Sequence, residues 1–420
     1  MSSICIEGGY PLSGCLKTQG SKNAALPILA ASVLHKGITR LINCPQISDV
    51  DSMIEILKKI GCIVTWERKA LVIDATNITS YDIPDEYTKR MRSSFILLGP
   101  LLGRRKKAII AYPGGCSIGV RPVNIHIDAL EKLNISIVKE ESRIIASTKK
   151  IQGNTIRLPY PSVGATQNCI LAAVYGHGTT EIYNCAKEPE VVELCKCLNQ
   201  MGAKIRGLGR AIIRIDGVKK LHDTEFEISA DRIAAGTYLT AAAITKGEIT
   251  LTHMEPFHLT ALLEVLIRTG CQIKQYMDAV ELSARNINHI RSIDLIKTGP
   301  YPEFPTDMQS QIMSLLMLAD GTSIIKEMVF EDRFKTAYEL EKMGANIKVE
   351  GKNAIVQGVS LVKGARVEAH DLRGGAALVI AGLAAQGTSR IEGFPYIERG
   401  YEGLCDSLEK LGAHICLVSD

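Results

Sequence analysis

The stretch that decides the fold is YELEKMGA at residues 338–345, because near copies of it recur along the whole chain. Each copy reads as the end of an amphipathic helix, followed by glycine and a small residue. One copy carries Asn134 in place of the glycine, and asparagine is the next best residue for a left-handed helix end. Successive copies are 68 to 74 residues apart. The other copies are MIEILKKIGC at 53–62, IDALEKLNIS at 127–136, LNQMGA at 198–203, LIRTGC at 266–271 and DSLEKLGA at 406–413.

A second series of helices alternates with the first. Its members, such as AALPILAASVLHKG at 24–37 and LVIAGLAAQG at 378–387, are apolar nearly all round, which is typical of buried helices. A short strand-like run follows each of them, and a hairpin-like pair such as CIVTWERKALVIDA at 62–75 follows the amphipathic helix. The pattern predicts an α/β protein built from six repeats of about 70 residues.

The two chain ends are expected to complete one repeat together. The last repeat stops after a single strand, AHICLVSD, and the missing strands resemble the N-terminal stretch SICIEGGYPLSG. Three repeats per domain is the natural division. It predicts one domain at 22–229, with a loop at 112–122, and a second domain made of 1–21 plus 230–420. The chain would cross between them near Gly20 and Ser229.

Composition excludes several classes of protein. The 420 residues carry 49 Lys and Arg against 45 Asp and Glu, a balance that leaves no basic footprint for nucleic acid. The apolar runs are too short to span a bilayer, and the start lacks the pattern of a secretory leader, so we expect a cytoplasmic protein without membrane insertion. The twelve cysteines are scattered, as is usual for reduced thiols, and the pair Cys195 and Cys197 is expected to pack within a helix.

Metal and nucleotide cofactors are not indicated either. The nine histidines form no HExxH motif, the cysteines form no paired CxxC motif, and no GxxxxGK[ST] loop is present. We therefore expect no metal and no cofactor. The oligomeric state is not predicted.

Positive residues stand at the start of several apolar helices. Lys22, Arg92, Arg232 and Arg373 lie where the helix dipole is already positive, so capping alone does not favour them. A bound anion reverses that preference, because helix N-termini attract phosphate and carboxylate groups. The pattern indicates a polyanionic substrate bound in a cleft between the two domains; the alternative is solvent-exposed charge at helix ends. Capping itself is expected from Asp371 and from a capping box at Thr306-x-x-Gln309.

The loop YPGGCSIGVRP at 112–122 is the other conspicuous segment. Three glycines surround Cys116, and Arg121 lies close by in the sequence. A guanidinium and a bound anion can tune a thiol for chemistry, so Cys116 is a candidate functional residue.

Six motifs along the chain together resemble a known family. They are Lys22-Asn23, PGGCSIGVRP at 113–122, SVGAT at 162–166, FPTDMQ at 304–309, DLRGGAA at 371–377 and ERGYE at 398–402. The chain is similar to the enolpyruvyl transferases, and among them to the UDP-N-acetylglucosamine 1-carboxyvinyltransferases, over essentially its whole length. The resemblance implies two domains of inside-out α/β-barrel type, each with three repeats. It also implies transfer of enolpyruvate from phosphoenolpyruvate to the 3′-hydroxyl of UDP-N-acetylglucosamine, with release of phosphate, as the first committed step of peptidoglycan synthesis.

The resemblance assigns roles residue by residue. Cys116 is the acid that protonates the methylene carbon, Asp307 is the base for the sugar hydroxyl, and Lys22 and Arg399 supply catalytic charge. Phosphoenolpyruvate is expected to bind Lys22, Asn23, Arg121, Arg373 and Arg399. UDP-N-acetylglucosamine is expected to bind Asn23, Arg92, Arg121, Pro122, Val123, Asn124, Ile125, Ser162, Val163, Gly164, Asp307 and Val329.

Two departures and three rival readings accompany the resemblance. Asn124 stands where the family usually has aspartate, and Tyr160-Pro161 stand where some members have lysine before SVGAT. The rivals are the sister enzyme that makes 5-enolpyruvylshikimate 3-phosphate, a non-catalytic paralogue that binds UDP-sugar, and an RNA-processing enzyme on a related repeat fold. Cys116 and Lys22-Asn23 argue against the sister enzyme.

Overall fold

The computed structural model describes residues 2–112, 118–119 and 123–419, and its chain divides into two compact units. The central unit runs from Gly20 to Ser229, apart from a short segment of the loop after Tyr112. The terminal unit holds both chain ends, up to Gln19 and from Ala230 onward. Ile118 and Gly119 also belong to the terminal unit, whereas the sequence-based division placed the whole loop with 22–229. The reason is tertiary, since the Asp332 amide donates to the carbonyl oxygen of Ile118 at 3.2 Å.

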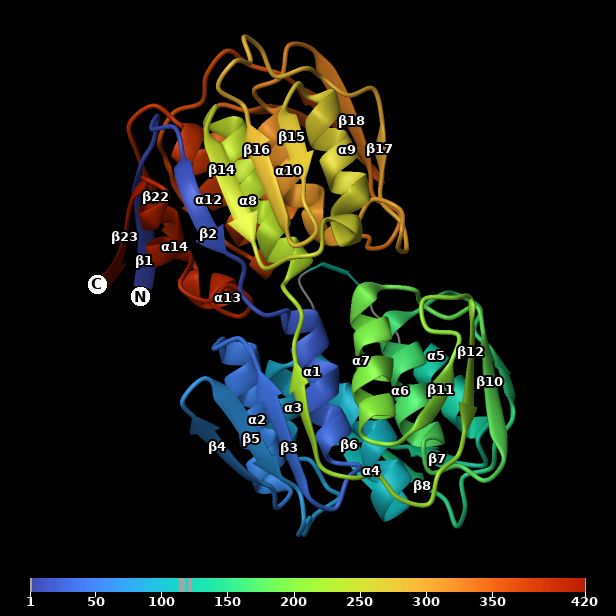
Figure 1. Ribbon diagram of the computed structural model, residues 1–420. Helices are drawn as coiled ribbons and strands as arrows, with labels where there is room; N and C mark the ends of the chain where they lie inside the picture. The colour runs from blue at the N-terminus through green and yellow to red at the C-terminus, as the bar shows by residue number, and fades with distance from the viewer. Residues whose placement is uncertain (1, 113–117, 120–122, 420) are drawn as a thin grey trace. The chain divides into compact units, whose positions relative to one another are not determined.

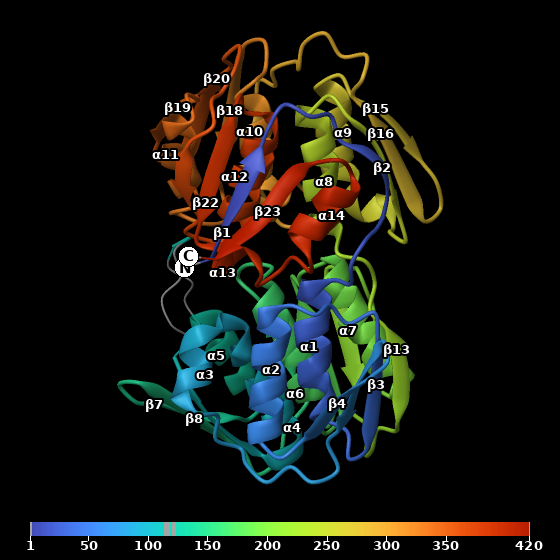
Figure 2. The same cartoon turned by 90° about the vertical axis from the view of Figure 1, so that its left-hand side faces the viewer.

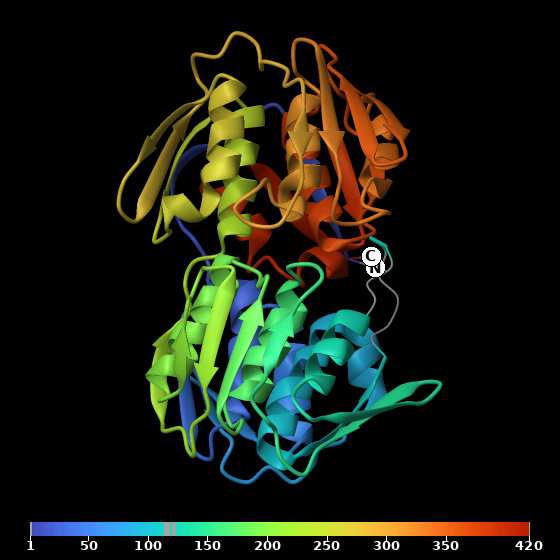
Figure 3. The ribbon, with the colours of Figure 1, turned by 90° about the vertical axis from the view of Figure 1, so that its right-hand side faces the viewer.

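The central unit contains three repeats of buried helix, strand, amphipathic helix and hairpin. Its elements are α1 (Lys22–Ser32), β3 (Ile38–Ile42), α2 (Ser48–Lys59), β4 (Ile63–Glu67), β5 (Ala70–Asp74), α3 (Asp85–Arg90), the 3-10 helix η1 (Arg92–Leu97), α4 (Leu98–Arg105), β6 (Lys107–Ala111), α5 (Asn124–Glu131), β7 (Ser136–Lys139), β8 (Arg143–Ser147), β9 (Thr155–Arg157), α6 (Val163–Ala173), β10 (Thr179–Tyr183), α7 (Pro189–Gln200), β11 (Lys204–Arg206), β12 (Ile212–Asp216) and β13 (Thr224–Glu227). The hairpin of β7 and β8 reaches outward from its unit (Figure 3).

The terminal unit repeats the same order. Its elements are β1 (Ser2–Glu7), β2 (Ser13–Lys17), α8 (Arg232–Ile244), β14 (Glu248–Thr252), η2 (Pro256–Leu259), α9 (Thr260–Arg268), β15 (Gln272–Gln275), β16 (Ala279–Ser283), β17 (Ile296–Lys297), η3 (Thr306–Met308), α10 (Gln309–Leu316), β18 (Thr322–Lys326), α11 (Lys335–Lys342), β19 (Asn346–Glu350), β20 (Asn353–Gln357), β21 (Arg366–Glu368), α12 (Leu372–Ala384), β22 (Thr388–Glu392), α13 (Phe394–Ile397), α14 (Leu404–Lys410) and β23 (His414–Ser419).

The sheets confirm the six repeats. Five of them have four strands in one shared pattern, a parallel pair followed by two antiparallel pairs, as in β17-β18-β20-β19. The sixth, β6-β8-β7, has three strands, and a single parallel bridge from Asp82 to Ile109 takes the place of the missing strand. The repeat therefore survives even where the local sequence no longer forms a full strand.

The N-terminal segment completes the last repeat, as the sequence predicted. Strand β1 lies between β22 and β23 and pairs antiparallel with both, with Cys5 opposite Cys416 (Figure 2). Strand β2 pairs in parallel with β14 in the neighbouring sheet. The two chain ends are thus tied into one unit by backbone hydrogen bonds.

Helices form the centre of each unit and sheets form its outside. In the terminal unit, α8, α10 and α12 contact one another, and the strands surround them (Figure 1). Most side chains of α12 are buried on all sides, as its uniformly apolar sequence predicted. In the terminal unit the starts of η3 and α12 come together, because Arg373 is hydrogen-bonded to Asp307.

The helix ends confirm two local predictions and correct a third. Gly344 and the other repeat glycines have positive φ, and Asn134 has φ 63° at the equivalent position. Asp371 caps α12 as expected, with its carboxylate accepting from the amides of Arg373 and Gly374. The capping box at Thr306 is wrong, because the Thr306 hydroxyl donates to Glu327 rather than capping its own helix.

Candidate active site

In the terminal unit, the carboxylate of Asp307 lies between two buried guanidinium groups. Arg333 Nη2 donates to Asp307 Oδ1 at 2.8 Å, and Arg373 Nη2 donates to Oδ2 at 3.3 Å. The side chains of Arg333 and Arg373 are only 2% and 4% exposed, whereas that of Asp307 is 29% exposed. The structure thus brings together two of the residues predicted from sequence, Asp307 and Arg373, and adds Arg333 to them.

The two arginines control the charge of this carboxyl. Burial by itself would raise the pKa of Asp307, but the nearby charges of Arg373 and Arg333 outweigh it and hold that pKa well below its usual range. Burial would likewise lower the pKa of Arg373, and the Asp307 carboxylate reverses this and raises it. The cluster therefore holds an ionised acid between two cations, with net positive charge.

Arg373 is held in place by its own helix and by one aromatic residue. Asp371 caps the first turn of α12, which fixes the backbone at Arg373. Arg373 Nη1 donates to the Tyr401 hydroxyl at 3.3 Å, and the guanidinium carbon lies 5.6 Å from the centre of that ring. The Tyr401 hydroxyl also lies 2.9 Å from Thr237 Oγ1 on α8. The first turn of α12, the Tyr401 side chain and, through Tyr401, helix α8 thus hold the Arg373 guanidinium in place.

Arg333 is a functional candidate that the sequence reasoning missed. Its Nε and Nη1 are buried, and among the described residues neither has a hydrogen-bond partner. Buried donors of a charged group are nearly always paired, so two free N–H groups indicate a place for an anionic ligand. The available signal was an arginine in VFEDRF at 329–334; it starts no apolar helix and so fell outside the pattern of cationic helix ends.

Arg399 lies in the turn that follows α13 and is half-buried. Gln19 braces this turn, because its Nε2 donates to the Gly400 carbonyl at 3.0 Å and its Oε1 accepts from the Glu402 amide at 2.9 Å. The turn also carries Tyr401, which contacts Arg373. The ERGYE motif at 398–402 therefore belongs to the same part of the terminal unit as Asp307.

The described residues of the loop lie against the segment that leads to Arg333. Ile118 accepts from the Asp332 amide, and a Cβ on Gly119 would come within 2.5 Å of Glu331 Oε2. Gly119 has φ 126°, a backbone conformation that favours glycine at this position. Three of the predicted site residues, Cys116, Arg121 and Pro122, lie outside the described residues.

In the central unit, Lys22 begins α1 and forms an ion pair with Asp49 of α2. The distance from Lys22 Nζ to Asp49 Oδ2 is 2.6 Å, and both side chains are largely buried. Ser21 caps the helix by accepting from the Ala24 amide. Asn23 follows Lys22 in the first turn and is partly exposed. Asp49 was not predicted, and its place at the second position of α2 gave no signal beyond ordinary helix-dipole charge.

A neutral histidine joins the starts of η1, α5 and α6. His126 is packed edge-on against Phe95, and burial followed by the charge of Arg92 lowers its pKa to about 4. Asn168 Nδ2 lies 2.9 Å from His126 Nδ1, while Asn168 Oδ1 accepts from the Gly99 amide. The amide nitrogen must therefore donate to Nδ1, which leaves the proton of the neutral ring on Nε2.

The same histidine explains Gly164. A Cβ there would lie 2.8 Å from His126 Cε1, so only glycine lets α6 approach α5 this closely. Ser162 caps α6 by accepting from the Ala165 amide, and Val163 is the first helical residue. The structure thus brings the predicted residues Arg92 and Gly164 together around His126, which the sequence reasoning did not single out.

The remaining predicted residues lie near these helix starts or near Arg333. Val123 is buried at the position before α5, Asn124 is the exposed first residue of that helix, and Ile125 packs against the core. Val329 belongs to the segment before Arg333, and its amide donates to Glu327. Arg232 begins α8, and its guanidinium carbon lies 5.7 Å from the Tyr301 ring centre.

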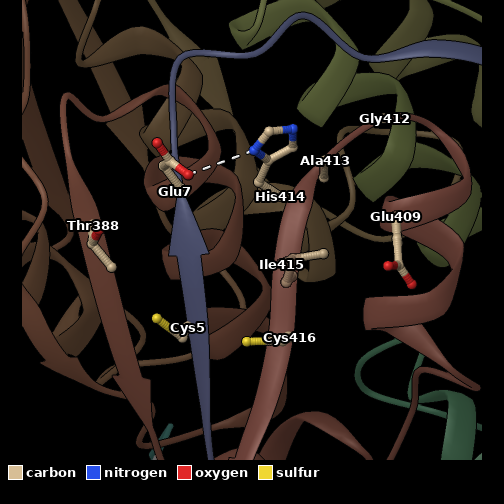
Figure 4. Close-up of a pocket in the computed structure, with 9 residues that line it drawn as sticks. All are labelled: Cys5, Glu7, Thr388, Glu409, Gly412, Ala413, His414, Ile415 and Cys416. Carbon is tan, nitrogen blue, oxygen red and sulfur yellow. Dashed lines mark ion pairs between the residues drawn. The ribbon is translucent and has the colours of Figure 1, made fainter.

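Two hollows of the terminal unit differ in the charge of their linings. One, of about 630 Å³, lies over β1, β22 and β23 and is lined by Glu7, Glu409 and His414 among others (Figure 4). It has no arginine or lysine in its lining, so it does not suit an anion. The other, of about 320 Å³, lies at the start of α8 and is lined by Arg232, Tyr301 and Pro305. The second hollow agrees better with the cationic helix ends.

Most described cysteines are unsuited to chemistry. Cys195 and Cys197 are buried in α7 as predicted, and burial raises the pKa of each to about 12. Burial likewise raises the pKa of Cys62 to about 12. Such thiols stay protonated and unreactive at neutral pH. Among the described residues, no group of three or more His, Cys, Asp or Glu side chains could hold a metal ion.

Comparisons with known proteins agree with the fold. The family model described as EPSP synthase (3-phosphoshikimate 1-carboxyvinyltransferase) matches residues 6–408. The chain is 49% identical over 418 residues to UDP-N-acetylglucosamine 1-carboxyvinyltransferase 2 of Caldanaerobacter subterraneus, covering 100% of both chains. It is 44% identical over 420 residues to the protein of that name from Carboxydothermus hydrogenoformans, again covering 100% of both.

The solved structures show the same architecture at lower identity. The enolpyruvyl transferase NikO from Streptomyces tendae superposes with a TM-score of 0.89 at 24% identity, covering 100% of this chain and 99% of the other. EPSP synthase from Acinetobacter baumannii superposes with a TM-score of 0.76 at 17% identity, covering 100% of both. These two likenesses concern the fold alone.

Proposed function

This chain belongs to the family of 3-phosphoshikimate and UDP-N-acetylglucosamine 1-carboxyvinyltransferases, and we propose that it is the second kind of enzyme. It transfers the enolpyruvyl group of phosphoenolpyruvate to the 3′-hydroxyl of UDP-N-acetylglucosamine and releases phosphate, the step that commits the sugar to peptidoglycan. The acceptor rests on the full-length relatives of that name at 43–49% identity. The observation in this chain that carries the chemistry is the ionised Asp307 between Arg333 and Arg373.

The arginine cluster is the proposed site for the anionic donor. Phosphoenolpyruvate carries a carboxylate and a phosphate, and the free Nε and Nη1 of Arg333 offer two parallel donors to one of them. Arg373 and Arg399 of the same unit supply further positive charge, with Lys22, Asn23 and Arg121 as the other proposed contacts. Fixed cations of this kind also stabilise charge that develops in the transition state.

Asp307 is the proposed base. In the addition step, the 3′-oxygen bonds to C2 of phosphoenolpyruvate, its proton passes to Asp307, and C3 gains a proton. A carboxylate held far below its usual pKa is a weak base. When the arginines turn part of their hydrogen bonding to the donor's anionic groups, their hold on Asp307 weakens and its pKa rises. The base thus strengthens once the donor is bound.

The acid for C3 is Cys116, by resemblance. The described residues Ile118 and Gly119 lie against Asp332 and Glu331, which stand one and two positions before Arg333 in the chain. This supports a loop that delivers the thiol toward the anion site. In the elimination step, C3 loses a proton again, the C2–O bond to phosphate breaks, and the enol ether product remains.

The nucleotide sugar is assigned to the helix starts of the central unit. The proposed contacts there are Arg92, Val123–Ile125 and Ser162–Gly164, with Arg121 and Pro122 from the loop and Val329 from the terminal unit. His126 joins them because its Nε2–H is a neutral donor beside Gly164. The backbone of Asn124 can still contact uridine, although its side chain lacks the carboxylate of the usual aspartate.

The reaction as proposed needs no metal or cofactor, and we place it in the cytoplasm. No helix among the described residues is long and apolar enough to cross a membrane.

The test is phosphate release. The purified chain is mixed with phosphoenolpyruvate and UDP-N-acetylglucosamine, each alone and both together, and released phosphate is measured. The proposal expects phosphate only when both are present, with formation of the enolpyruvyl nucleotide sugar by mass spectrometry. Asp307→Asn is the matched variant, because it keeps the shape of the side chain and removes the base.

The sister activity is tested in the same assay, since the family model carries its name. Shikimate 3-phosphate replaces the nucleotide sugar, and we expect no phosphate release. Release with shikimate 3-phosphate alone would assign the sister activity instead. A chain that binds the nucleotide sugar without releasing phosphate would be a non-catalytic paralogue.

A further inference from the structure

A buried carboxylate outside the proposed reaction, that of Glu327, bonds the residue before Asp307 and stands six residues before Arg333 in the chain. Glu327 follows strand β18 and is 1% exposed. Its Oε1 accepts from the Thr298 hydroxyl at 2.8 Å and from the amides of Val329 and Phe330 at 2.8 and 3.2 Å. Its Oε2 accepts from the Thr306 hydroxyl at 2.8 Å. One side chain therefore receives four hydrogen bonds from three separate segments.

The direction of these bonds is fixed. The Met328 amide donates to Thr298 Oγ1 at 2.9 Å, so the Thr298 hydroxyl points its own hydrogen toward Glu327. The amides of Val329 and Phe330 can only donate. Oε1 is thus an acceptor for three donors. Unlike Asp307, this carboxylate has no arginine or lysine partner among the described residues, which suits a group that holds geometry rather than one that moves protons.

The three segments are the ones that position the proposed reactive groups. Thr298 follows the short strand β17, Thr306 is the residue before Asp307, and the 328–330 turn leads to Arg333. The same turn contains Val329, and the segment beyond it accepts the loop at Asp332. Glu327 is the one described side chain that bonds both to the neighbour of Asp307 and to the turn before Arg333.

We propose that Glu327 is a positioning residue of the reaction, which sets the distance between the Asp307 carboxylate and the Arg333 guanidinium by tying Thr306 to the 328–330 turn. The proposal rests on the proposed function, because it concerns the same site. Without the tie, η3 and the turn each keep their backbone contacts, such as the Met308 amide to the Pro305 carbonyl, but lose their common anchor. A displacement of about 1 Å at such a site costs about a hundredfold in rate.

The test compares two substitutions at Glu327 with one at a matched residue. Glu327→Gln keeps an oxygen that can accept the three Oε1 bonds, and the Thr306 hydroxyl can rotate to meet the amide. Glu327→Ala removes all four. The control is Glu339→Ala, because Glu339 is another buried carboxylate of this unit, 5% exposed, that bonds Lys342 and the Glu368 amide instead. Phosphate release gives kcat and KM for both substrates, and thermal unfolding gives the melting temperature.

The expected result separates positioning from stability. Glu327→Ala lowers kcat about a hundredfold with a smaller change in KM for UDP-N-acetylglucosamine, and Glu327→Gln restores kcat to within about threefold of the wild type. Glu339→Ala lowers the melting temperature and leaves kcat within about threefold, since it does not touch the site.

Three results would overturn the proposal. They are a wild-type kcat in Glu327→Ala, an equal loss of kcat in Glu339→Ala, and a loss in Glu327→Gln as large as in Glu327→Ala, which would make charge and not geometry the cause. A wild-type chain that releases no phosphate refutes the proposed function itself. The positioning role alone fails when the wild type is active and the substitutions follow one of these three patterns.

If Glu327→Ala does not fold, a second pair of variants tests the same proposal. Thr306→Val removes one of the four bonds and is combined with Glu327→Gln. We expect Thr306→Val to lower kcat about tenfold and the double variant to lose little more, because both act through the same tie. Fully additive losses would show two independent effects and would overturn the proposal.

Discussion

Replacing Arg333 should lower kcat/KM for phosphoenolpyruvate more than it lowers the stability of the fold. The substitution is Arg333→Met, which keeps an unbranched apolar side chain of similar length in a site that is 2% exposed. In the wild type, Nη2 of Arg333 bonds Asp307, while Nε and Nη1 have no partner among the described residues. The N–H groups on these two nitrogens are therefore available to bind phosphoenolpyruvate, and the substitution removes them.

The magnitude follows from the chemistry of those donors. A hydrogen bond between charged partners contributes about 1.5–3 kcal/mol, and two that act on one anion do not simply add. A loss of about 3 kcal/mol in transition-state stabilisation corresponds to roughly a hundredfold in kcat/KM for phosphoenolpyruvate. Unfolding stability should fall by less than this, because Asp307 keeps Arg373 and two unmet buried donors disappear.

The assay is phosphate release at saturating UDP-N-acetylglucosamine and varied phosphoenolpyruvate, with urea unfolding in parallel. The control is Arg206→Met, because Arg206 also pairs with a carboxylate, Asp216, but is 72% exposed. It should leave kcat/KM unchanged. An unchanged kcat/KM for phosphoenolpyruvate in Arg333→Met would refute the assignment of the free donors to the substrate. So would a kinetic loss that is fully explained by an unfolded fraction.

Four further outcomes are expected. Gly164→Ala should destabilise the fold by about 1–3 kcal/mol in urea unfolding, because its Cβ would lie 2.8 Å from His126 Cε1; a neutral result would contradict the close packing. The pKa of Asp307 is lowered by folding, so its stabilising effect is present above its unfolded pKa of about 3.9 and is lost as the pH falls. The difference in unfolding free energy between wild type and Asp307→Asn should therefore be larger at neutral pH than in strong acid, and an equal difference at both would refute the ion-pair argument. An epoxide of the fosfomycin type should alkylate Cys116 alone in peptide mapping, and adducts spread over several cysteines would argue against a tuned thiol. Arg399→Ala should reduce turnover far more than melting temperature, whereas unchanged kinetics would remove Arg399 from the donor site.

Much of the fold could be predicted from the chain because each repeat is marked by local sequence patterns at its helix ends and in its buried helices. Glycine or asparagine at each amphipathic helix end reflects a backbone with positive φ, a requirement that one residue meets by itself. Uniformly apolar helices such as α12 must be buried wherever they occur. The truncated last repeat also required a partner strand, and β1 supplies it.

Part of the candidate site followed from the same signals. Arg373 was recognisable because a cation at a helix start is unfavourable without an anion. Asp307 came from the FPTDMQ motif of the resembling family. Both depend on a residue and its near neighbours in the chain, which a sequence displays directly.

The tertiary structure alone decided which charged side chains pair with one another. Arg333 is 26 residues from Asp307 in the chain and its motif marks no helix start, yet its guanidinium bonds that carboxylate at 2.8 Å. Thr306 looked like a helix cap, but it is the first residue of η3, and its hydroxyl donates to Glu327. The pKa of His126 is lowered to about 4 because burial disfavours the charged ring, with Arg92 adding repulsion. Helix ends and burial are set by local conformation and hydrophobicity, whereas hydrogen-bond partners and ionisation depend on distances that exist only once the repeats have packed together.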